Sequence, residues 1–558
     1  MDKIDSIYIG ADSLITALGD KMSTVDAMYS GVSGLTFNQE YGMYLGIIDR
    51  THDSACVHDG YTFFESLIIN QLKNVFSSSC MDVRDESLLV IISTTKGNVD
   101  KLQDSLSPLS DDVYLYVSAE KISKYFGFAN PPIVLSNACI SGVSALVVAR
   151  ELILEGKYSH VVVFGCDVLS HFITEGFASF KSISATPCRP YDSERDGLTL
   201  GEACGAILLT TEQKYASKPY VRLAGGAITN DANHISGPSR TGDGLFYAID
   251  NAINESGLSK DDIAFVNAHG TATVYNDEME SKAIDWAGLS NVPVNSLKGY
   301  IGHTLGASGV VESILSIHQL REGIVYGTAG FRLLGTSKEI KVSSSSSEIF
   351  KKSCVKTASG FGGCNAAVVF TMQDISLCKP GYSDVEELIS YELPYSESPF
   401  HEFIRAEYKK FGESNMKFYK MSDLCKAAYV GTMNLLSGVS LLDNLNDKNV
   451  SVILSNKSSS LEADIEHQVI LNEKNPEGAS PAVFVYTLPN VAIGELCIRH
   501  KIRGNNTFFI ENTYSGLCEE YGRLLIKNGK TDYVICGWCE KLGESYSVKL
   551  KLLKKADI

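Results

Sequence analysis

A cysteine stands at the junction of a predicted strand and a predicted helix. Cys139 follows the apolar run 132–138 and directly precedes the helical pattern 141–156. A helix N-terminus presents unpaired backbone N–H groups and the positive end of the helix dipole, which favour a thiolate and can hold an oxyanion. The position therefore predicts a nucleophile. The alternative is a buried cysteine that packs as a small hydrophobe, since the chain has 14 cysteines.

Two histidines stand beside glycine at the ends of other predicted elements. His269 follows the apolar run 263–266, so we expect it at the carboxyl end of a strand, where α/β proteins place their sites. His303 lies between Lys298 and the amphipathic run 310–320. One cysteine and two histidines form a set suited to nucleophilic attack and proton handling. Zinc is the competing use, but the closely spaced Cys or His pairs of zinc sites are missing around all three.

Seven short motifs follow one another along residues 1–375. They are STTKGN (93–98), NACISG (137–142), GF (176–177), RPYD with RDG and GE (189–202), NAHGTAT with ND and E (267–280), KGYIGHTLGASGVVE (298–312) and GFGGCNAA (360–367). In this order they resemble the β-ketoacyl-acyl carrier protein synthases of the elongating type, in the thiolase superfamily. A thiolase would be expected to show a second cysteine, and an initiating synthase an asparagine in place of one histidine.

The resemblance implies a role for each of these residues. Cys139 would take an acyl chain from a carrier-protein thioester, and a malonyl thioester would then decarboxylate to an enolate that attacks the acyl-cysteine. His269 and His303 would donate hydrogen bonds to the enolate oxygen. The loop expected to support the Cys139 oxyanion is Ser359, Gly360 and Phe361.

The resemblance also assigns a lysine and a glutamate, and it exposes two departures. Lys298 matches the family's active-site lysine and Glu312 its partner, although a buried ion pair that never touches substrate is the alternative. Ser359 stands where elongating synthases usually carry a phenylalanine that gates the acyl pocket, so a roomier or more polar pocket is expected. Ala272 replaces a more usual glycine, which costs little only if its backbone does not need positive φ.

Composition bounds the remaining functions. The 558 residues are 44% hydrophobic, which predicts two or three domains. No uninterrupted apolar run approaches the ~20 residues of a membrane span, and the N-terminus has no signal-peptide pattern, so we expect a cytoplasmic protein without a membrane span. The net charge of −17 argues against nucleic acid as a partner. No metal or cofactor is expected.

Alternating strand and helix patterns predict an α/β protein with parallel crossovers. The family's version is an αβαβα sandwich of two similar halves, here residues 1–215 with the nucleophile and 216–375 with the histidines and the lysine. Such synthases are commonly homodimers, with the strand beside the nucleophile near the interface. An acyl carrier protein, acyl- or malonyl-loaded, is the implied partner, and a heteromeric synthase partner is a further possibility. An acidic carrier would need a local basic patch, for which Lys121 and Lys124 are candidates.

The chain continues past this match, and its tail repeats the pattern of the first half. The repeated features are the runs 452–455, 507–510, 522–526 and 533–537, which echo 90–93, 132–138, 149–153 and 160–165. The residues opposite Cys139 are Asn512, Thr513 and Tyr514, none of them a cysteine. We therefore expect a linker over 376–400 and a third, partial α/β half over 401–558, a degenerate thiolase-like half that has lost its chemistry. It would cover the acyl tunnel, extend the dimer interface or recruit a partner, much as chain-length-factor partners resemble synthases without the nucleophile.

Three functions remain open from the sequence. The leading one is decarboxylative condensation during elongation of a fatty acid or a polyene- or polyketide-like chain. The second is a synthase biased toward decarboxylation or initiation, in which the loop at Ser359 spoils acyl acceptance. The third is an assembly or chain-length-control subunit, for which the degenerate tail is the best argument.

Overall fold

The first sheet of the computed structural model carries the strand that leads to Cys139. The structure describes residues 6–104, 106, 108–377, 383–412, 415–437, 439, 449–473 and 478–556. The strands of this sheet lie in the order β1 (Tyr8–Thr16), β9 (Ala203–Thr210), β7 (His160–Asp167), β5 (Leu88–Ser93) and β6 (Ile133–Leu135). The last three are mutually parallel, and β1 and β9 are antiparallel. These strands read as continuous apolar runs because helices cover both faces of the sheet.

The second sheet repeats this order and carries the histidine loops. Its strands are β10 (Arg222–Asn230), β17 (Cys364–Thr371), β16 (Ser353–Gly360), β11 (Ile263–Asn267) and β12 (Pro293–Asn295). Again two antiparallel strands precede a run of parallel ones. The carboxyl ends of its parallel strands therefore face the same edge, where α/β sites form.

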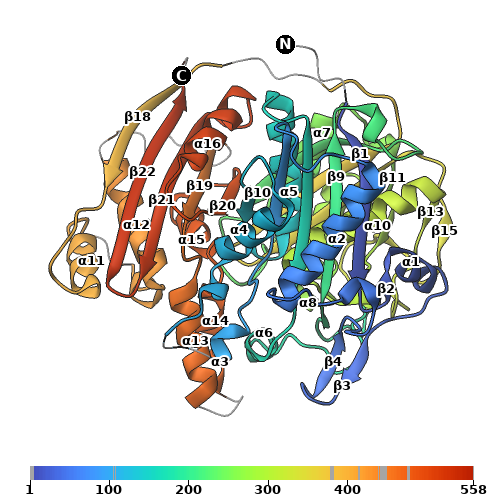
Figure 1. Cartoon of the computed structure of the whole chain (residues 1–558), viewed down its shortest axis with the longest axis horizontal. Coiled ribbons are helices and arrows are strands. Elements are labelled where there is room, and N and C mark those ends of the chain that lie inside the picture. The colour runs from blue at the N-terminus through green and yellow to red at the C-terminus, as the bar shows by residue number, and fades with distance from the viewer. Residues whose placement is uncertain are drawn as a thin grey trace.

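Two central helices pack between the sheets and approach each other closely. They are α5 (Ser141–Glu155) and α10 (Ser308–Glu322). A Cβ placed on Gly142 would lie 2.6 Å from the backbone nitrogen of Val310, and one on Gly309 would lie 2.3 Å from that of Val143, so only glycine permits this crossing. The outer faces are covered by α2 (Phe63–Ser79) on one side and α7 (Asp243–Ser256) on the other, which completes an αβαβα sandwich (Figure 1). Among the described residues, no helix is long and apolar enough to cross a membrane.

A third sheet is built by residues 383–556, here called the C-terminal segment. Its strands are β18 (Val385–Glu392), β22 (Ser545–Lys555), β21 (Tyr533–Leu542), β19 (Val450–Asn456) and β20 (Asn506–Ile510). Order and strand directions match those of the first sheet. The helices α12 (Asp423–Ser437) and α16 (Leu517–Lys527) pack against this sheet.

The first and third sheets join edge to edge. β20 pairs antiparallel with β6, through Phe509 opposite Leu135 and Ile510 opposite Val134, so one sheet runs across the molecule (Figure 1). Asn137 strengthens the junction, because its side-chain amide donates to the Asn506 carbonyl at 2.7 Å and accepts from the Phe508 N–H at 2.8 Å. The resemblance implied a homodimer with the strand beside the nucleophile near the interface. In this chain β20 pairs with that edge of β6, and the homodimer stays a prediction.

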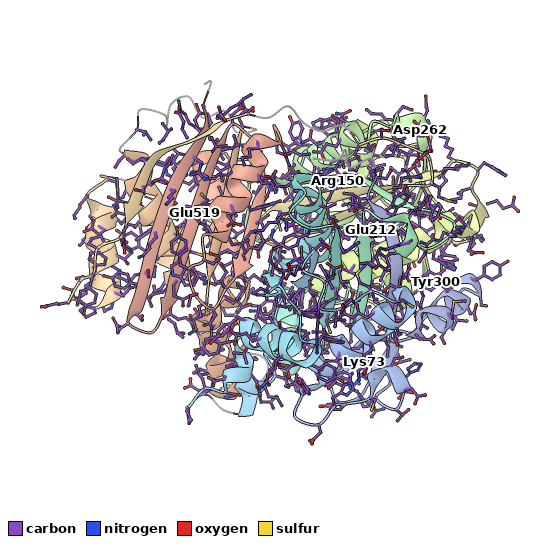
Figure 2. All side chains as sticks on the ribbon, turned by 45° about the horizontal axis from the view of Figure 1, so that its top comes forward. Lys73, Arg150, Glu212, Asp262, Tyr300 and Glu519 are labelled. Atoms are coloured by element: carbon purple, nitrogen blue, oxygen red, sulfur yellow. The ribbon has the colours of Figure 1, made fainter. Side chains whose placement is uncertain are left out.

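Charged side chains also cross the junction of the C-terminal segment. Lys96 of the STTKGN motif forms a buried ion pair with Asp464 at 2.5 Å. Arg150 on α5 pairs with its neighbour Glu151, whose other oxygen accepts from Asn528 at 2.8 Å. Figure 2 labels Arg150 and, across the junction on α16, Glu519. Buried charges need such partners, so these contacts fix how the segment sits on the rest of the chain.

One boundary differs from the sequence expectation. Residues 376–400 were expected to form a linker, but β18 lies within them and pairs with β22 along its length. Three cross-strand ion pairs support it: Lys549 with Glu392 at 3.2 Å, Lys551 with Glu387 at 3.1 Å and Lys554 with Glu386 at 3.5 Å. Its apolar residues Val385, Ile389 and Tyr391 are only partly buried and the other positions are exposed, so the strand shows only a weak hydrophobic alternation.

Candidate active site

Cys139 sits in a tight turn between β6 and α5. The turn is a 3-10 helix over Ala138–Ile140, and Ala138 adopts a left-handed φ of 47°. The Ser141 hydroxyl holds this conformation, because it accepts from the Asn137 N–H at 2.8 Å and donates to the Ala138 carbonyl at 2.6 Å. A left-handed alanine costs about 1–2 kcal/mol, which the surrounding hydrogen bonds must offset. The turn places Cys139 at the start of α5 with 7% of its surface exposed.

The loop of Ser359, Gly360 and Phe361, here called the glycine loop, lies directly against this turn. A Cβ placed on Gly360 would lie 3.2 Å from the Cys139 backbone nitrogen, so the absence of a side chain keeps the space beside that N–H open. The Cys139 N–H is a donor suited to an oxyanion formed on a Cys139-bound acyl group. The loop and the nucleophile therefore meet as the resemblance implied.

The opposite side of the loop is aromatic. Ser359 donates its hydroxyl to Asn365 Oδ1 at 2.7 Å, so the hydroxyl is not free to make a pocket polar. Phe361 packs on Phe177 and Phe180, with ring centroids 6.0 and 5.3 Å apart. Phe484 of the C-terminal segment joins the same ring cluster, 5.4 Å from Phe177. The polar surrounding expected from Ser359 is thus replaced by a group of phenylalanine rings.

The two histidines lie together although they come from separate loops. The rings of His269 and His303 are nearly perpendicular, with centroids 5.1 Å apart, and each residue is only 2% exposed. His303 Nδ1 contacts the Ser308 hydroxyl at 3.2 Å, which leaves Nε2 for a ligand. Burial and the nearby Lys298 hold the pKa of each histidine well below its usual range. Both are therefore neutral near pH 7, and each can donate one N–H.

The loop that carries His269 is fixed by a buried glutamate. Glu280 on α8 (Val274–Trp286) accepts the backbone N–H of His269 and that of Gly270, both at 2.7 Å. Thr357 also donates to it, at 2.7 Å. Two residues farther along the loop, Ala272 has a φ of 63°. Ala272 therefore adopts a left-handed conformation that is unfavourable for alanine. We expected this alanine to cost little only if its φ were not positive, and that condition is not met.

The predicted lysine–glutamate pair is present, and it has a third member. Lys298 Nζ lies 2.7 Å from Glu312 Oε1. Lys356 Nζ, from β16, lies 2.5 Å from the other oxygen, Oε2. Sequence reasoning missed Lys356, although a lysine within the otherwise small and apolar strand 353–360 was a signal that a buried charge needs a partner.

The protonation state expected for Cys139 is not the one the structure favours. Burial raises the pKa of the Cys139 thiol to about 12, and Lys298 offsets this effect only in part. The helix N-terminus had suggested a thiolate. Burial disfavours the charged form of the sulfur, so at this raised pKa the resting nucleophile is a thiol.

The C-terminal segment touches the active-site loop directly. Asn490 donates its side-chain amide to the Phe361 carbonyl at 2.8 Å. A Cβ on Gly494 of α15 (Val491–His500) would lie 2.7 Å from the Gly362 carbonyl oxygen, so this helix is packed closely on the loop. No local motif marks Asn490 or Phe484, because their importance arises only from the tertiary contact.

Two family models match the chain. The model described as beta-ketoacyl synthase, N-terminal domain, matches residues 77–215, and the model described as beta-ketoacyl synthase, C-terminal domain, matches residues 220–332. A 3-oxoacyl-[acyl-carrier-protein] synthase 2 of Mycobacterium leprae is 30% identical over 314 residues, which cover 52% of this chain and 75% of the relative. The mitochondrial 3-oxoacyl-[acyl-carrier-protein] synthase of Arabidopsis thaliana is 30% identical, over 51% of this chain and 66% of that relative.

Two solved structures are informative in different ways. The ketosynthase ApeO in complex with its chain length factor ApeC, from Xenorhabdus doucetiae, matches with 26% identity and a TM-score of 0.58, over 66% of this chain and 98% of that chain. The PfaC keto synthase–chain length factor matches with 13% identity and a TM-score of 0.78, over 99% of this chain and 78% of that chain. At such low identity the second match concerns the fold alone, but it extends through the C-terminal segment.

Proposed function

Because this chain belongs to the β-ketoacyl synthase family, we propose that it condenses a cysteine-bound acyl chain with a malonyl unit carried by an acyl carrier protein. The observation that carries the proposal is that Cys139 lies against the Gly360 loop, that the His269 and His303 rings are in contact, and that the charge of Lys298 acts on all three residues. A pure assembly subunit would have no need for all three.

In the first half-reaction Cys139 takes the acyl group. Its sulfur attacks the thioester carbonyl of the acyl carrier, a new C–S bond forms, and the carrier thiol leaves with the proton that Cys139 loses. The negative charge on the carbonyl oxygen is stabilised by the Cys139 N–H at the start of α5. Lys298 favours the thiolate during the step, since its charge lowers the pKa of Cys139 against the effect of burial.

In the second half-reaction the malonyl thioester loses carbon dioxide. The electron pair of the broken C–C bond moves onto the thioester oxygen, and the neutral imidazoles of His269 and His303 each donate an N–H to that enolate. The enolate carbon then attacks the acyl carbonyl on Cys139, which forms the new C–C bond and breaks the C–S bond. The departing cysteine sulfur takes up a proton, so the resting thiol is restored.

We further propose that the C-terminal segment is a third synthase-like half that serves as a built-in partner subunit. Its strand order repeats that of the first sheet, and its edge strand β20 pairs with β6. At the position of the nucleophile it carries Asn512, Thr513 and Tyr514. Its contacts with the Phe361 loop support a role in shaping the acyl site, so chain-length control belongs to this segment rather than to the chain as a whole.

A product assay tests this function. Wild-type protein would be incubated with an acyl carrier protein and with malonyl carrier labelled with ¹³C, and the carriers analysed by mass spectrometry. Condensation predicts a 3-oxoacyl carrier longer by two labelled carbons, which is lost in His269→Ala. Acetyl carrier without 3-oxoacyl product would favour the decarboxylase-biased alternative, and neither product would contradict an active synthase.

A further inference from the structure

Lys356 is a second lysine in the active-site core to which the family motifs assign no role. It lies on β16, opposite Asn267 of the strand that leads to His269. Its side chain is fully buried, and besides the pair with Glu312 it donates to the Thr357 carbonyl at 2.8 Å and to the Ala268 carbonyl at 3.5 Å. The ammonium group thus contacts the residue immediately before His269.

The Lys356 ammonium belongs to a group of four buried charges. Lys298 and Lys356 hold the two oxygens of Glu312 from opposite ends, and all three side chains are at most 1% exposed. The second carboxylate is Glu280, which attracts Lys356 and grips the His269 loop through two backbone N–H groups. The two cations and two anions balance in charge. Lys356 is the member that interacts both with Glu312, the partner of Lys298, and with Glu280, which holds the His269 loop.

We propose that Lys356 is a positioning residue that sets the orientation and the protonation of the histidine pair for the malonyl half-reaction. The inference rests on the proposed condensing function. Lys356 fixes Glu312 and the Ala268 carbonyl directly, and through Glu280 it fixes the loop that aims His269. The cation that acts on Cys139 is Lys298, so the role proposed for Lys356 concerns the histidines and not the sulfur.

The charge of Lys356 acts on both imidazoles. The charged groups that act on them are the ammonium groups of Lys298 and Lys356, and the two imidazole rings also contact each other. The anions of the group, Glu312 and Glu280, hold the two lysines and the backbone of the His269 loop. The two lysines lower the pKa of both histidines further than burial alone. Removing the Lys356 charge raises these pKa values, so protonation, which destroys the neutral donor pair, begins at a higher pH.

The experiment compares Lys356→Met with Lys356→Arg in the full-length chain and measures each half-reaction separately. Acylation of Cys139 is followed by intact mass with an acyl carrier protein, and decarboxylation by release of carbon dioxide from malonyl carrier. We expect K356M to retain acylation within a few fold and to lose about 10²-fold in decarboxylation, the scale expected when a reacting group is misplaced. The acidic limb of its pH profile for decarboxylation should move to higher pH. K356R should keep the acidic limb of the wild type and recover part of the decarboxylation rate.

Lys351→Met is the matched control, because it removes an exposed lysine just before the same strand and should change neither half-reaction. If K356M does not fold, K356R provides the test. Slower decarboxylation with normal acylation, and an acidic limb at the wild-type pH, would support the inference. An equal loss of acylation and decarboxylation would overturn the inference. So would a K356M variant whose decarboxylation rate and pH profile match those of the wild type. A wild-type protein that neither acylates nor decarboxylates would instead refute the proposed function, and the inference with it.

Discussion

The ring of Phe484 fills the space beside Gly176 that any other side chain at that position would need. A Cβ placed on Gly176 would lie 2.1 Å from the ring. Gly176 belongs to α6 (His171–Ser179) next to the active site, whereas Phe484 belongs to α14 (Pro481–Tyr486) of the C-terminal segment. The two parts of the chain are therefore fitted to each other at the aromatic cluster around Phe361.

Shortening Phe484 should change the length of acyl chain that the enzyme accepts. Phe484→Leu removes part of the ring from the cluster beside Phe361, and each extra methylene accommodated by an apolar pocket is worth about 1–3 kcal/mol. We expect the ratio of long-chain to short-chain acylation of Cys139 to rise by about tenfold or more. Phe403→Leu is the control, because Phe403 in α11 (Phe400–Lys409) stacks on Tyr546 and not on the cluster around Phe361. An unchanged ratio in Phe484→Leu would remove the C-terminal segment from chain-length control.

The buried ion pair across the junction should be essential for stability. Lys96→Met leaves the carboxylate of Asp464 buried without its partner, which should cost about 3–5 kcal/mol in the free energy of unfolding. The double variant Lys96→Met with Asp464→Leu should recover most of that loss. Lys157→Met breaks an exposed pair with Glu520 at the same junction and should cost less than about 1 kcal/mol. Chemical denaturation measures all three, and equal effects of the two lysine variants would contradict a junction held by the buried pair.

Alkylation of Cys139 should report a buried thiol rather than a resting thiolate. Because burial raises the pKa of this thiol to about 12, the thiolate fraction should increase about tenfold per pH unit between pH 7 and 10. The rate of reaction with iodoacetamide, followed by peptide mass mapping to separate it from exposed Cys56 and Cys80, should rise accordingly. A plateau below pH 8 would show that the helix N-terminus outweighs burial.

The occupied edge of β6 predicts that two chains do not associate through it. Native mass spectrometry at micromolar concentration should show a species with the mass of one chain, because β20 already supplies the antiparallel neighbour. A dimer with its interface on another surface would leave the β6 edge paired with β20. A dimer formed through the β6 edge would contradict the prediction.

The site was predictable where its residues lie in local motifs, and less so where they meet through the fold. Cys139 and both histidines stand at element ends within short motifs that contain glycine, and Glu312 belongs to the same motif as Lys298, so the motifs identified them. The pairing of Lys356 with Glu312 joins a residue outside the motifs to one inside them, and no spacing rule reveals it. The same holds for Asn137, whose amide binds a strand that begins at Asn506.

The protonation of the site and one boundary also escaped the sequence, for physical reasons. The helix N-terminus is visible in a sequence, but the depth of burial that raises the pKa of Cys139 is a property of the packed molecule. β18 was read as a linker because its apolar residues Val385, Ile389 and Tyr391 are only partly buried, and its pairing with β22 becomes visible only in the fold.

The central claim is that Cys139 carries the growing chain. Intact-mass measurement after incubation with acyl carrier proteins of several chain lengths tests it directly, in the wild type and in Cys139→Ala. The account predicts one acyl adduct on the wild type, none on Cys139→Ala, and loss of the adduct when malonyl carrier protein is added. No adduct on the wild type with any chain, or an equal adduct on Cys139→Ala, would contradict it.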